Sequence, residues 1–185
     1  MRIISGTFKS RQLKGTPPSG IRPTSDKLRE TLFNILGDRV SGSQFLDAFA
    51  GMGAVGIEAI SRGAREVAFV DSSRKATAII RQNLTSLGIR AGFRLLETEF
   101  SKACKIFERE GVTFDIAFLD PPYDREDLYT SALEIMGNMS LLGDDGILVM
   151  EHSKRDEFAG ASGILDKYRT LAQGDSSLSF YRKRA

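Results

Sequence analysis

Short apolar segments alternate with amphipathic segments along most of this chain, and that order constrains its fold more than any other feature. Each apolar segment is rich in β-branched, aromatic or Leu residues and ends at a turn. The strands predicted in this way cover residues 44–49, 66–70, 93–96, 114–119 and 147–150. Because parallel strands joined by helices are buried on both faces, this order predicts an α/β protein with a mostly parallel sheet and helices on both faces.

Apolar residues recur at helical spacing in the segments between these strands. Helices are predicted over residues 25–36, 54–62, 72–87, 102–110 and 127–139. Ser25 and Ser72 are suitable N-cap residues, and Gly37, Gly63 and Gly88 are suitable helix ends.

The C-terminal part departs from the alternation. Residues 167–173 and 177–182 predict two strands joined around Gly174 and Asp175, which form a hairpin. Such a hairpin adds an antiparallel strand to a parallel sheet. We therefore expect a mostly parallel, seven-stranded sheet with an antiparallel C-terminal hairpin strand.

The composition is that of one soluble domain. A chain of 185 residues with 41% hydrophobic content can bury one core but is short for two, so residues 1–185 are predicted to form a single domain. No apolar stretch is long enough to span a bilayer, and no signal peptide is recognised. Cys104, the sole cysteine, excludes an internal disulfide and a cysteine metal cluster. We expect a cytoplasmic protein with no membrane partner and no metal.

A glycine-rich turn follows the first predicted strand, where an open parallel sheet binds its ligand. Gly51, Gly53 and Gly56 have the spacing G-x-G-x-x-G, and Asp71 follows Gly51 by twenty positions. By spacing alone this pattern also fits a nicotinamide or flavin dinucleotide. Asp47 favours a different ligand, because a carboxylate four residues before the first glycine suits a cation better than a pyrophosphate. S-adenosylmethionine carries an ammonium and a sulfonium and no phosphate, so it is the preferred cofactor.

Residues after the next two strands extend this predicted site. Asp71 can accept hydrogen bonds from both ribose hydroxyls. Glu99 can accept from the adenine amino group while the backbone N–H of Phe100 meets a ring nitrogen. The predicted cofactor-binding residues are Asp47, Phe49, Gly51, Gly53, Asp71, Glu99 and Phe100.

The motif Asp120-Pro121-Pro122-Tyr123 directly follows the apolar segment 114–119. Each proline fixes its own φ and lacks an N–H, so the carbonyls here face outward. The Asp120 carboxylate and the Pro121 carbonyl can then accept both hydrogens of an exocyclic amino group and direct its lone pair at an electrophile. Tyr123 supplies a flat face for the base. The motif predicts methylation of a base nitrogen, and the alternative interpretation is a plain strand end with a Pro-Pro turn.

The formal net charge of +2 is unevenly distributed along the chain. Residues 1–25 contain five basic residues and no acidic ones, which predicts contacts with phosphates. The alternative is a solvated segment that binds nothing in particular. The basic residues in question are Arg2, Lys9, Arg11, Lys14 and Arg22.

Blocks of residues spread over nearly the whole chain match one known family. They are Arg2-Ile3-Ile4-Ser5-Gly6, Arg22-Pro23-Thr24-Ser25, Arg29-Glu30, Leu32-Phe33-Asn34, the loop Asp47 to Gly51 with Gly53 and Gly56, Glu58-Ala59, Ser61-Arg62-Gly63-Ala64, and Asp120 to Tyr123. Together they resemble the RsmD family of bacterial ribosomal RNA methyltransferases. The N-terminal blocks discriminate best, because many amino-methylating enzymes share the glycine loop and the Asp-Pro-Pro-Tyr motif.

This resemblance implies the class I S-adenosylmethionine-dependent, Rossmann-like methyltransferase fold. It also implies N2-methylation of one guanine in 16S ribosomal RNA, with the base flipped out of its helix and S-adenosylhomocysteine as the second product. Asp120, the Pro121 carbonyl and Tyr123 would be the catalytic residues, and Asp71 would bind the ribose. Residues 1–24 would be a basic RNA-contacting extension. The partner would be 16S rRNA or the small ribosomal subunit particle, with no obligate protein partner.

The sequence departs from the family pattern at a few positions of the predicted site. The family more often has Asp where this chain has Glu99, Glu where it has Asp71, and a small residue where it has Met52. A longer or shorter acid leaves the acceptor in place, so the predicted ligand is unchanged.

Other functions fit parts of the pattern. An amino methyltransferase acting on DNA adenine or cytosine would need a separate base-reading module, for which the chain has no room. A methyltransferase acting on protein glutamine resembles Asn rather than Asp before Pro-Pro-Tyr. A non-catalytic RNA-binding protein would not need the intact motif from Asp120 to Tyr123. His152, the sole histidine, is predicted to be a structural residue at a strand end, and Cys104 a small buried hydrophobe.

Overall fold

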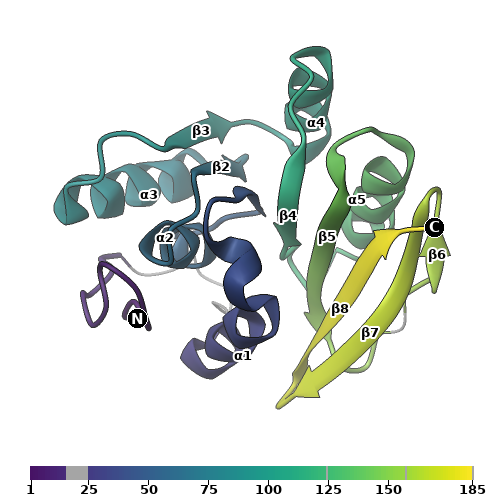
Figure 1. The fold of residues 1–185 in the computed structure, drawn as a ribbon, viewed down its shortest axis with the longest axis horizontal. Helices are drawn as coiled ribbons and strands as arrows, with labels where there is room; N and C mark the ends of the chain where they lie inside the picture. The colour runs from purple at the N-terminus through teal and green to yellow at the C-terminus, as the bar shows by residue number, and fades with distance from the viewer. Residues whose placement is uncertain (16–24, 124, 157, 185) are drawn as a thin grey trace.

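The computed structural model describes residues 1–15, 25–123, 125–156 and 158–184, and they contain one mixed sheet (Figure 1). Its eight strands have the order β3-β2-β1-β4-β5-β8-β7-β6. The strands are β1 Gln44–Ala48, β2 Glu66–Asp71, β3 Phe93–Glu97, β4 Phe114–Leu119, β5 Leu142–Ser153, β6 Ala161–Ser162, β7 Leu165–Gln173 and β8 Ser176–Lys183. Strands β1 to β5 are parallel to one another, whereas β8, β7 and β6 continue the sheet antiparallel.

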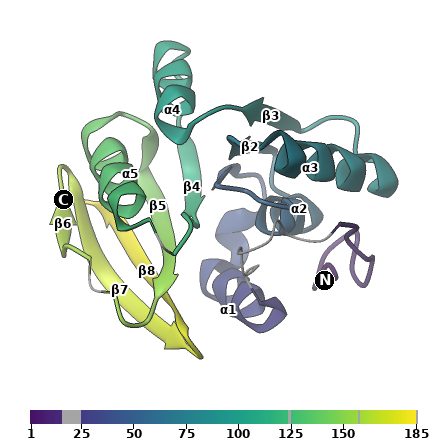
Figure 2. The same cartoon turned by 180° about the vertical axis from the view of Figure 1, so that it is seen from behind.

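Helices cover both faces of this sheet, as the front and back views show (Figures 1 and 2). They are α1 Asp26–Leu36, followed by the short 3-10 helix η1 Gly37–Val40, then α2 Ala54–Ser61, α3 Arg74–Leu87, α4 Phe100–Arg109 and α5 Glu126–Asn138. Helices α1, α2 and α3 share one hydrophobic cluster, and α4 and α5 share the other. The predicted α/β class, with a mostly parallel sheet and an antiparallel C-terminal hairpin, is confirmed.

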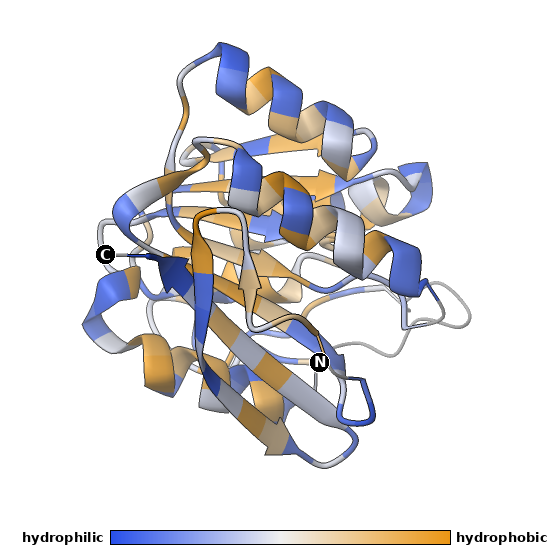
Figure 3. Cartoon of the chain, turned by 90° about the vertical axis from the view of Figure 1, so that its right-hand side faces the viewer, coloured by the Kyte–Doolittle hydropathy of each residue, from blue (hydrophilic) through white to orange (hydrophobic). Residues whose placement is uncertain are grey.

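Each central strand buries alternate side chains in the two clusters. On β4, Ile116 and Phe118 face the cluster of α1 to α3, whereas Ala117 and Leu119 face the cluster of α4 and α5. Figure 3 shows the result: hydrophobic colour runs along the strands, and the helices carry bands of both colours. Burial on both faces explains why the strands appear in the sequence as continuous apolar segments.

Local signals set most of the helix boundaries. Ser25 caps α1, because its hydroxyl accepts from the backbone N–H of Leu28 over 3.1 Å. Gly37 has φ +55°, and its N–H closes the helix on the carbonyl of Phe33. The predicted cap of α3 was wrong by one residue: Ser73, not Ser72, accepts from the N–H of Ala76.

Several elements differ from the predictions in extent, and one strand was not predicted. Helix α4 begins at Phe100 rather than residue 102, because the Phe100 side chain is buried against the sheet and belongs to the helical face. Strand β5 extends well beyond 147–150, since its first residues pair with β4 across an irregularity in register despite glycines and aspartates of low strand propensity. The two-residue strand β6 is the eighth strand, and it is too short to leave a periodic pattern.

No helix in the described part of the chain is long and apolar enough to cross a membrane.

Candidate active site

The predicted site residues meet at one edge of the sheet, at the carboxyl ends of its parallel strands. Asp47 lies on β1, Asp71 ends β2, and Asp120 directly follows β4. Strand β1 pairs with both β2 and β4. The backbone N–H of Asp120 donates to the carbonyl of Ala48 over 3.4 Å, which joins the ends of β4 and β1. The two predicted halves of the site therefore lie side by side, where an open parallel sheet binds ligands.

The Asp47 carboxylate is buried beneath the glycine-rich turn. The residue is 2% exposed, and its Oδ2 accepts a hydrogen bond from the backbone N–H of Gly56 over 2.7 Å. Burial raises the pKa of the Asp47 carboxyl to about 8; the hydrogen bond from Gly56 opposes this shift, and the charge of Asp71 adds to it. Asp47 thus fixes the start of α2 from below the turn.

Gly56 is required by close packing. A Cβ at this position would lie 2.3 Å from the Phe69 ring and 2.9 Å from Oδ2 of Asp47. Because both neighbours are buried, a larger residue between α2 and the sheet would have to displace one of them. The third glycine of the G-x-G-x-x-G spacing is therefore explained by helix–strand packing.

The Asp71 carboxylate holds the same turn from the neighbouring strand. Its Oδ2 accepts from the N–H of Gly51 and its Oδ1 from the N–H of Ser73, each over 2.8 Å. Burial raises the pKa of Asp71, the two backbone hydrogen bonds lower it, and the charge of Glu99 raises it further. Each carboxylate oxygen has a second lone pair, so Asp71 can still accept from ribose hydroxyls.

Two predicted cofactor residues form an aromatic contact beside this turn. The rings of Phe49 and Phe100 are 5.3 Å apart between centroids. Phe49 has φ +58°, a left-handed conformation that costs a non-glycine residue about 1–3 kcal/mol and is typical of functional sites. Glu99 is exposed at the start of α4 and makes no side-chain capping hydrogen bond there. Asp47, Asp71 and Glu99 thus place carboxylates at the ends of three consecutive strands of the sheet.

The Pro121 carbonyl, predicted to accept from an amino group, already has one hydrogen bond. The hydroxyl of Tyr129 donates to it over 2.6 Å in the buried layer between α5 and the sheet. A carbonyl oxygen has two lone pairs, so a second donor can still bind. Sequence reasoning did not anticipate Tyr129, because it lies on a helix and its apolar neighbours make it look like a core residue.

Tyr123 is held by its hydroxyl. The hydroxyl donates to Oε1 of Glu151 over 3.0 Å and lies 2.8 Å from Oγ of Ser176. Burial and the charge of Glu151 raise the pKa of Tyr123 above its usual value, so it stays protonated. The residue is 38% exposed, which leaves part of the ring accessible for stacking. Glu151 lies at the end of β5, a position that the rule for parallel sheets could have indicated.

His152 and Cys104 lie inside the fold. His152 is 3% exposed, with Nε2 2.8 Å from Oγ of Ser179 and Nδ1 2.8 Å from the carbonyl of Ser153, and burial lowers its pKa. These contacts to β8 and to its own strand fit the predicted structural role. Cys104 is fully buried, and burial raises the pKa of its thiol to about 12, as expected for a small core residue.

Comparison with known proteins shows the family of this chain. The model of the family described as "Conserved hypothetical protein 95" matches residues 1–182. The "Putative rRNA methyltransferase YlbH" of Bacillus subtilis is 35% identical over all of this chain and all of its own length. "Ribosomal RNA small subunit methyltransferase D" of Escherichia coli is 30% identical over all of this chain and 91% of its own. The chain belongs to the RsmD family.

A solved structure agrees with this assignment to the RsmD family. The "Putative methyltransferase yhhF from Escherichia coli" has a TM-score of 0.84 and 29% identity, and the match covers 100% of this chain and 98% of that one. The match therefore includes the antiparallel end of the sheet as well as its parallel part.

The basic N-terminal segment of this RsmD-family chain is anchored to the domain. Glu58 of α2 is fully buried and accepts from the backbone N–H groups of Ile4 and Ser5 over 2.8 and 3.0 Å. It also pairs with Arg62 over 2.8 Å, and Nε of the buried Arg29 lies 3.8 Å from its Oε2. Residues 1–15 are therefore a docked segment, and the rest of the predicted extension, residues 16–24, lies outside the described residues.

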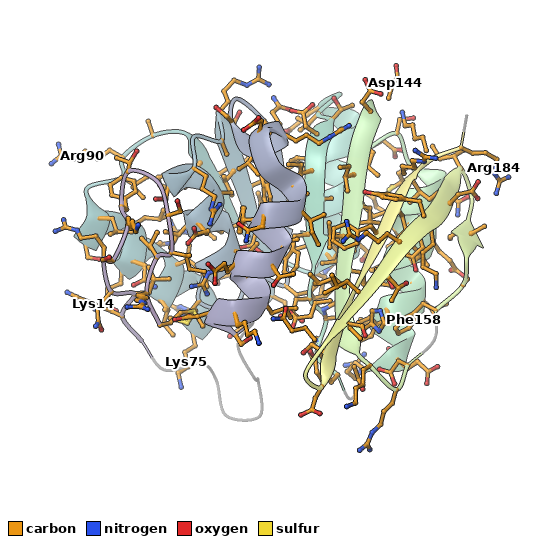
Figure 4. All side chains as sticks on the ribbon, turned by 60° about the horizontal axis from the view of Figure 1, so that its bottom comes forward. Lys14, Lys75, Arg90, Asp144, Phe158 and Arg184 are labelled. Atoms are coloured by element: carbon orange, nitrogen blue, oxygen red, sulfur yellow. The ribbon has the colours of Figure 1, made fainter. Side chains whose placement is uncertain are left out.

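The charged side chains of the docked segment point outward while its apolar ones are buried. Ile3 and Leu13 are buried in the cluster of α1 to α3. Figure 4 shows Lys14 on the same side of the molecule as Lys75 and Arg90, away from Asp144 and Arg184. The predicted RNA contacts Arg2, Lys9, Arg11 and Lys14 are all exposed, and Arg22 lies outside the described residues.

Among the described residues, no group of three or more His, Cys, Asp or Glu side chains is arranged to hold a metal ion.

Proposed function

We propose that this protein transfers a methyl group from S-adenosylmethionine to the N2 amino group of one guanine in 16S ribosomal RNA. The observation that carries the proposal is the adjacency of two structures: the acidic glycine-rich turn after β1 and the Asp120-Pro121-Pro122-Tyr123 motif after β4. The two strands are paired along Ala48 and Leu119, so a donor in the turn and an acceptor at the motif would be neighbours.

The charge of the turn favours S-adenosylmethionine as the methyl donor. The carboxylates of Asp71, at the end of β2, and of Glu99, at the start of α4, attract a ligand with an ammonium and a sulfonium and oppose a pyrophosphate. In this proposal Asp71 accepts from the ribose hydroxyls, and Glu99 with the N–H of Phe100 binds the adenine edge. Phe49, Gly51 and Gly53 shape the turn around the ligand, as expected from their left-handed backbone.

The motif after β4 provides the acceptor side. Asp120 and the Pro121 carbonyl accept the two hydrogens of the guanine amino group, and Tyr123 stacks on the base, which is flipped out of its helix. The nitrogen lone pair attacks the methyl carbon, the carbon–sulfur bond breaks with its electrons going to sulfur, and the nitrogen releases one proton to water. The products are N2-methylguanine and S-adenosylhomocysteine. Most of the rate enhancement comes from positioning and polarising the amine.

Two observations favour ribosomal RNA as the polymer. Relatives at 30% identity or more carry names that specify ribosomal RNA methyltransferases, and in the E. coli relative the small subunit. Exposed Arg2, Lys9, Arg11 and Lys14 on the docked segment provide charge for phosphate contacts. The substrate in the cell is either the naked 16S rRNA or an assembled small-subunit particle. A DNA adenine or cytosine methyltransferase is the alternative.

The test is methyl incorporation from tritiated S-adenosylmethionine into naked 16S RNA, assembled small subunits, DNA and protein. We expect label in an RNA fraction, recovered as N2-methylguanosine after digestion. Label in DNA alone would replace the proposal by its alternative, and no label in RNA would overturn it. Asp120→Ala should abolish incorporation while the Kd for S-adenosylmethionine, measured by calorimetry, changes little; unchanged turnover would remove Asp120 from its assigned role.

A further inference from the structure

The contact between Tyr129 and Pro121 has a geometry that the proposed reaction can use. Tyr129 lies near the start of α5, is 1% exposed, and donates its hydroxyl hydrogen to the Pro121 carbonyl over 2.6 Å. Its ring stacks on Phe158 with centroids 5.0 Å apart and an interplanar angle of 19°, and Phe158 packs edge-on against His152 at 5.1 Å. Because the ring is fixed on one face, the hydroxyl has little freedom to point elsewhere.

The peptide group between Pro121 and Pro122 needs an anchor of this kind. A peptide plane in a loop is usually held through its N–H, its carbonyl or both. Pro122 has no N–H, so the plane can be held only through the Pro121 oxygen. In the described structure the Tyr129 hydroxyl donates to that oxygen.

We propose that Tyr129 is a positioning residue for methyl transfer: its hydroxyl fixes the direction of the Pro121 carbonyl so that the second lone pair faces the acceptor amino group. This inference rests on the proposed function, because it assumes that Pro121 receives the amine. The hydroxyl remains a donor over the working pH range, since burial and the nearby charge of Asp120 raise the pKa of Tyr129. Tyr129 touches neither substrate nor cofactor and acts through Pro121.

The decisive variant is Tyr129→Phe, and the chain offers a matched control. Tyr181 on β8 is also fully buried, belongs to the same hydrophobic cluster, and donates its hydroxyl to a backbone carbonyl, that of Ala159, over 3.3 Å. Tyr181→Phe therefore removes a buried hydroxyl that donates to a carbonyl outside the motif. We expect both variants to fold and to lose comparable stability in denaturant titrations.

The expected difference lies in turnover. A hydrogen bond that orients a reacting group is worth about a 2- to 10-fold change in rate. Tyr129→Phe should lower kcat by about that factor, with the KM for the nucleic acid and the Kd for S-adenosylmethionine unchanged. Tyr181→Phe should leave all three constants unchanged. Equal kcat values for the two variants would overturn the inference, and so would a Tyr129→Phe variant whose only change is a weaker Kd or KM.

The assay keeps this inference separate from the proposed function. Kinetics are measured on whichever acceptor the wild type labels, so label in DNA rather than RNA would overturn the RNA proposal and still test Tyr129. If no acceptor is labelled, both fall. Phe158→Leu provides a second route, because it removes the ring that orients Tyr129 and retains the hydroxyl. Phe158→Leu should also lower kcat, but by less than Tyr129→Phe does. An unchanged kcat would contradict the role given to the stacked ring.

Discussion

The two sides of the candidate site hold their polar groups in different ways. On the β1–β2 side, the carboxylates of Asp47 and Asp71 bind backbone N–H groups of Gly56, Gly51 and Ser73, all between β1 and the start of α3. On the β4–β5 side, the motif from Asp120 to Tyr123 is held by side chains that come from other elements. Tyr129 comes from α5, Glu151 from β5 and Ser176 from β8.

This difference predicts different sensitivities. The β1–β2 side depends on backbone conformation and on glycines that have no substitute, so changes there should cost stability and cofactor binding together. The β4–β5 side depends on individual hydroxyl and carboxyl groups, which can be removed while the ring and the fold remain. Changes there should act mainly on turnover.

Gly56→Ala should have the largest effect. The added Cβ would lie 2.3 Å from the Phe69 ring and 2.9 Å from Oδ2 of Asp47, so it must displace one of them. Overpacking of this kind costs about 1–3 kcal/mol, and we expect the free energy of unfolding to fall by that amount with loss of S-adenosylmethionine binding. Chemical denaturation and calorimetry measure the two effects.

Gly143→Ala is the control for this change. A Cβ there would lie 3.7 Å from the nearest atom, the carbonyl oxygen of Phe114, which is an ordinary contact. Stability and affinity should remain close to those of the wild type. If Gly56→Ala lost stability but kept its affinity, the link between the turn and the cofactor would be wrong.

The second prediction concerns the pH dependence of stability and Asp47. Its pKa is about 8 in the folded protein against an ordinary value of 3.8, so between these values the folded state holds a proton that the unfolded state has lost. The contribution of Asp47 therefore favours folding at low pH and decreases as pH rises, until it levels off near the folded pKa.

Asp47→Asn isolates this contribution, because asparagine retains an oxygen that can accept from Gly56 but does not titrate. The difference in unfolding free energy between the wild type and Asp47→Asn should become less favourable to the wild type as pH rises from about 5 to about 8. A difference that stays constant over this interval would show that Asp47 is ionised throughout in the folded protein.

Tyr123→Phe should have a smaller effect, and on turnover rather than on the fold. The ring remains for stacking, but the hydrogen bonds to Glu151 and Ser176 are lost. Each such bond contributes about 0.5–1.5 kcal/mol, so we expect kcat to fall a few-fold with the Kd for S-adenosylmethionine unchanged. The matched control is Tyr168→Phe on β7, which is 43% exposed against 38% for Tyr123. A loss of cofactor affinity in Tyr123→Phe would contradict the division between the two sides.

The same division explains what the sequence could predict. Asp47, Gly51, Gly56 and Asp71 lie within one βαβ unit, so their spacing indicated that they meet at one turn. The hydrogen bonds from the N–H groups of Gly51 and Gly56 to these carboxylates were not predicted. The alternation of strands and helices could also be predicted, because it depends on residues that are close together in the sequence. Tyr129 was hidden because a buried tyrosine on an amphipathic helix has the same pattern whether or not its hydroxyl has a function.

Most of the contacts that the sequence did not predict join residues far apart in the chain. Ser176 is 53 residues from Tyr123, and Glu58 is 54 residues from Ile4, and neither residue type is distinctive where it occurs. The docking of the N-terminal segment by a buried carboxylate was therefore not predicted, although its basic charge was. Periodicity reports which face of an element is buried, not which distant backbone group a polar side chain will reach.

The smallest effect is expected when basic charge is removed from the docked N-terminal segment. This change tests whether the β1–β2 side binds the cofactor alone. Asn83 of α3 accepts from the N–H of Lys14 over 2.7 Å and donates to the carbonyls of Lys14 and Met52, which connects this segment to the glycine-rich turn. Exposed Lys9 and Arg11 lie on the segment, so removing their charge should leave its anchoring intact.

Lys9→Gln and Arg11→Gln should each weaken RNA binding modestly and lower the slope of log affinity against log salt by about 1, because each change removes one phosphate contact. Lys105→Gln, an exposed lysine on α4 on the opposite face of the sheet, is the control and should leave the slope unchanged. Affinity for S-adenosylmethionine should be the same in all three variants. Equal salt slopes in all three would remove the segment from the RNA interface, and the β1–β2 side would then serve the cofactor only.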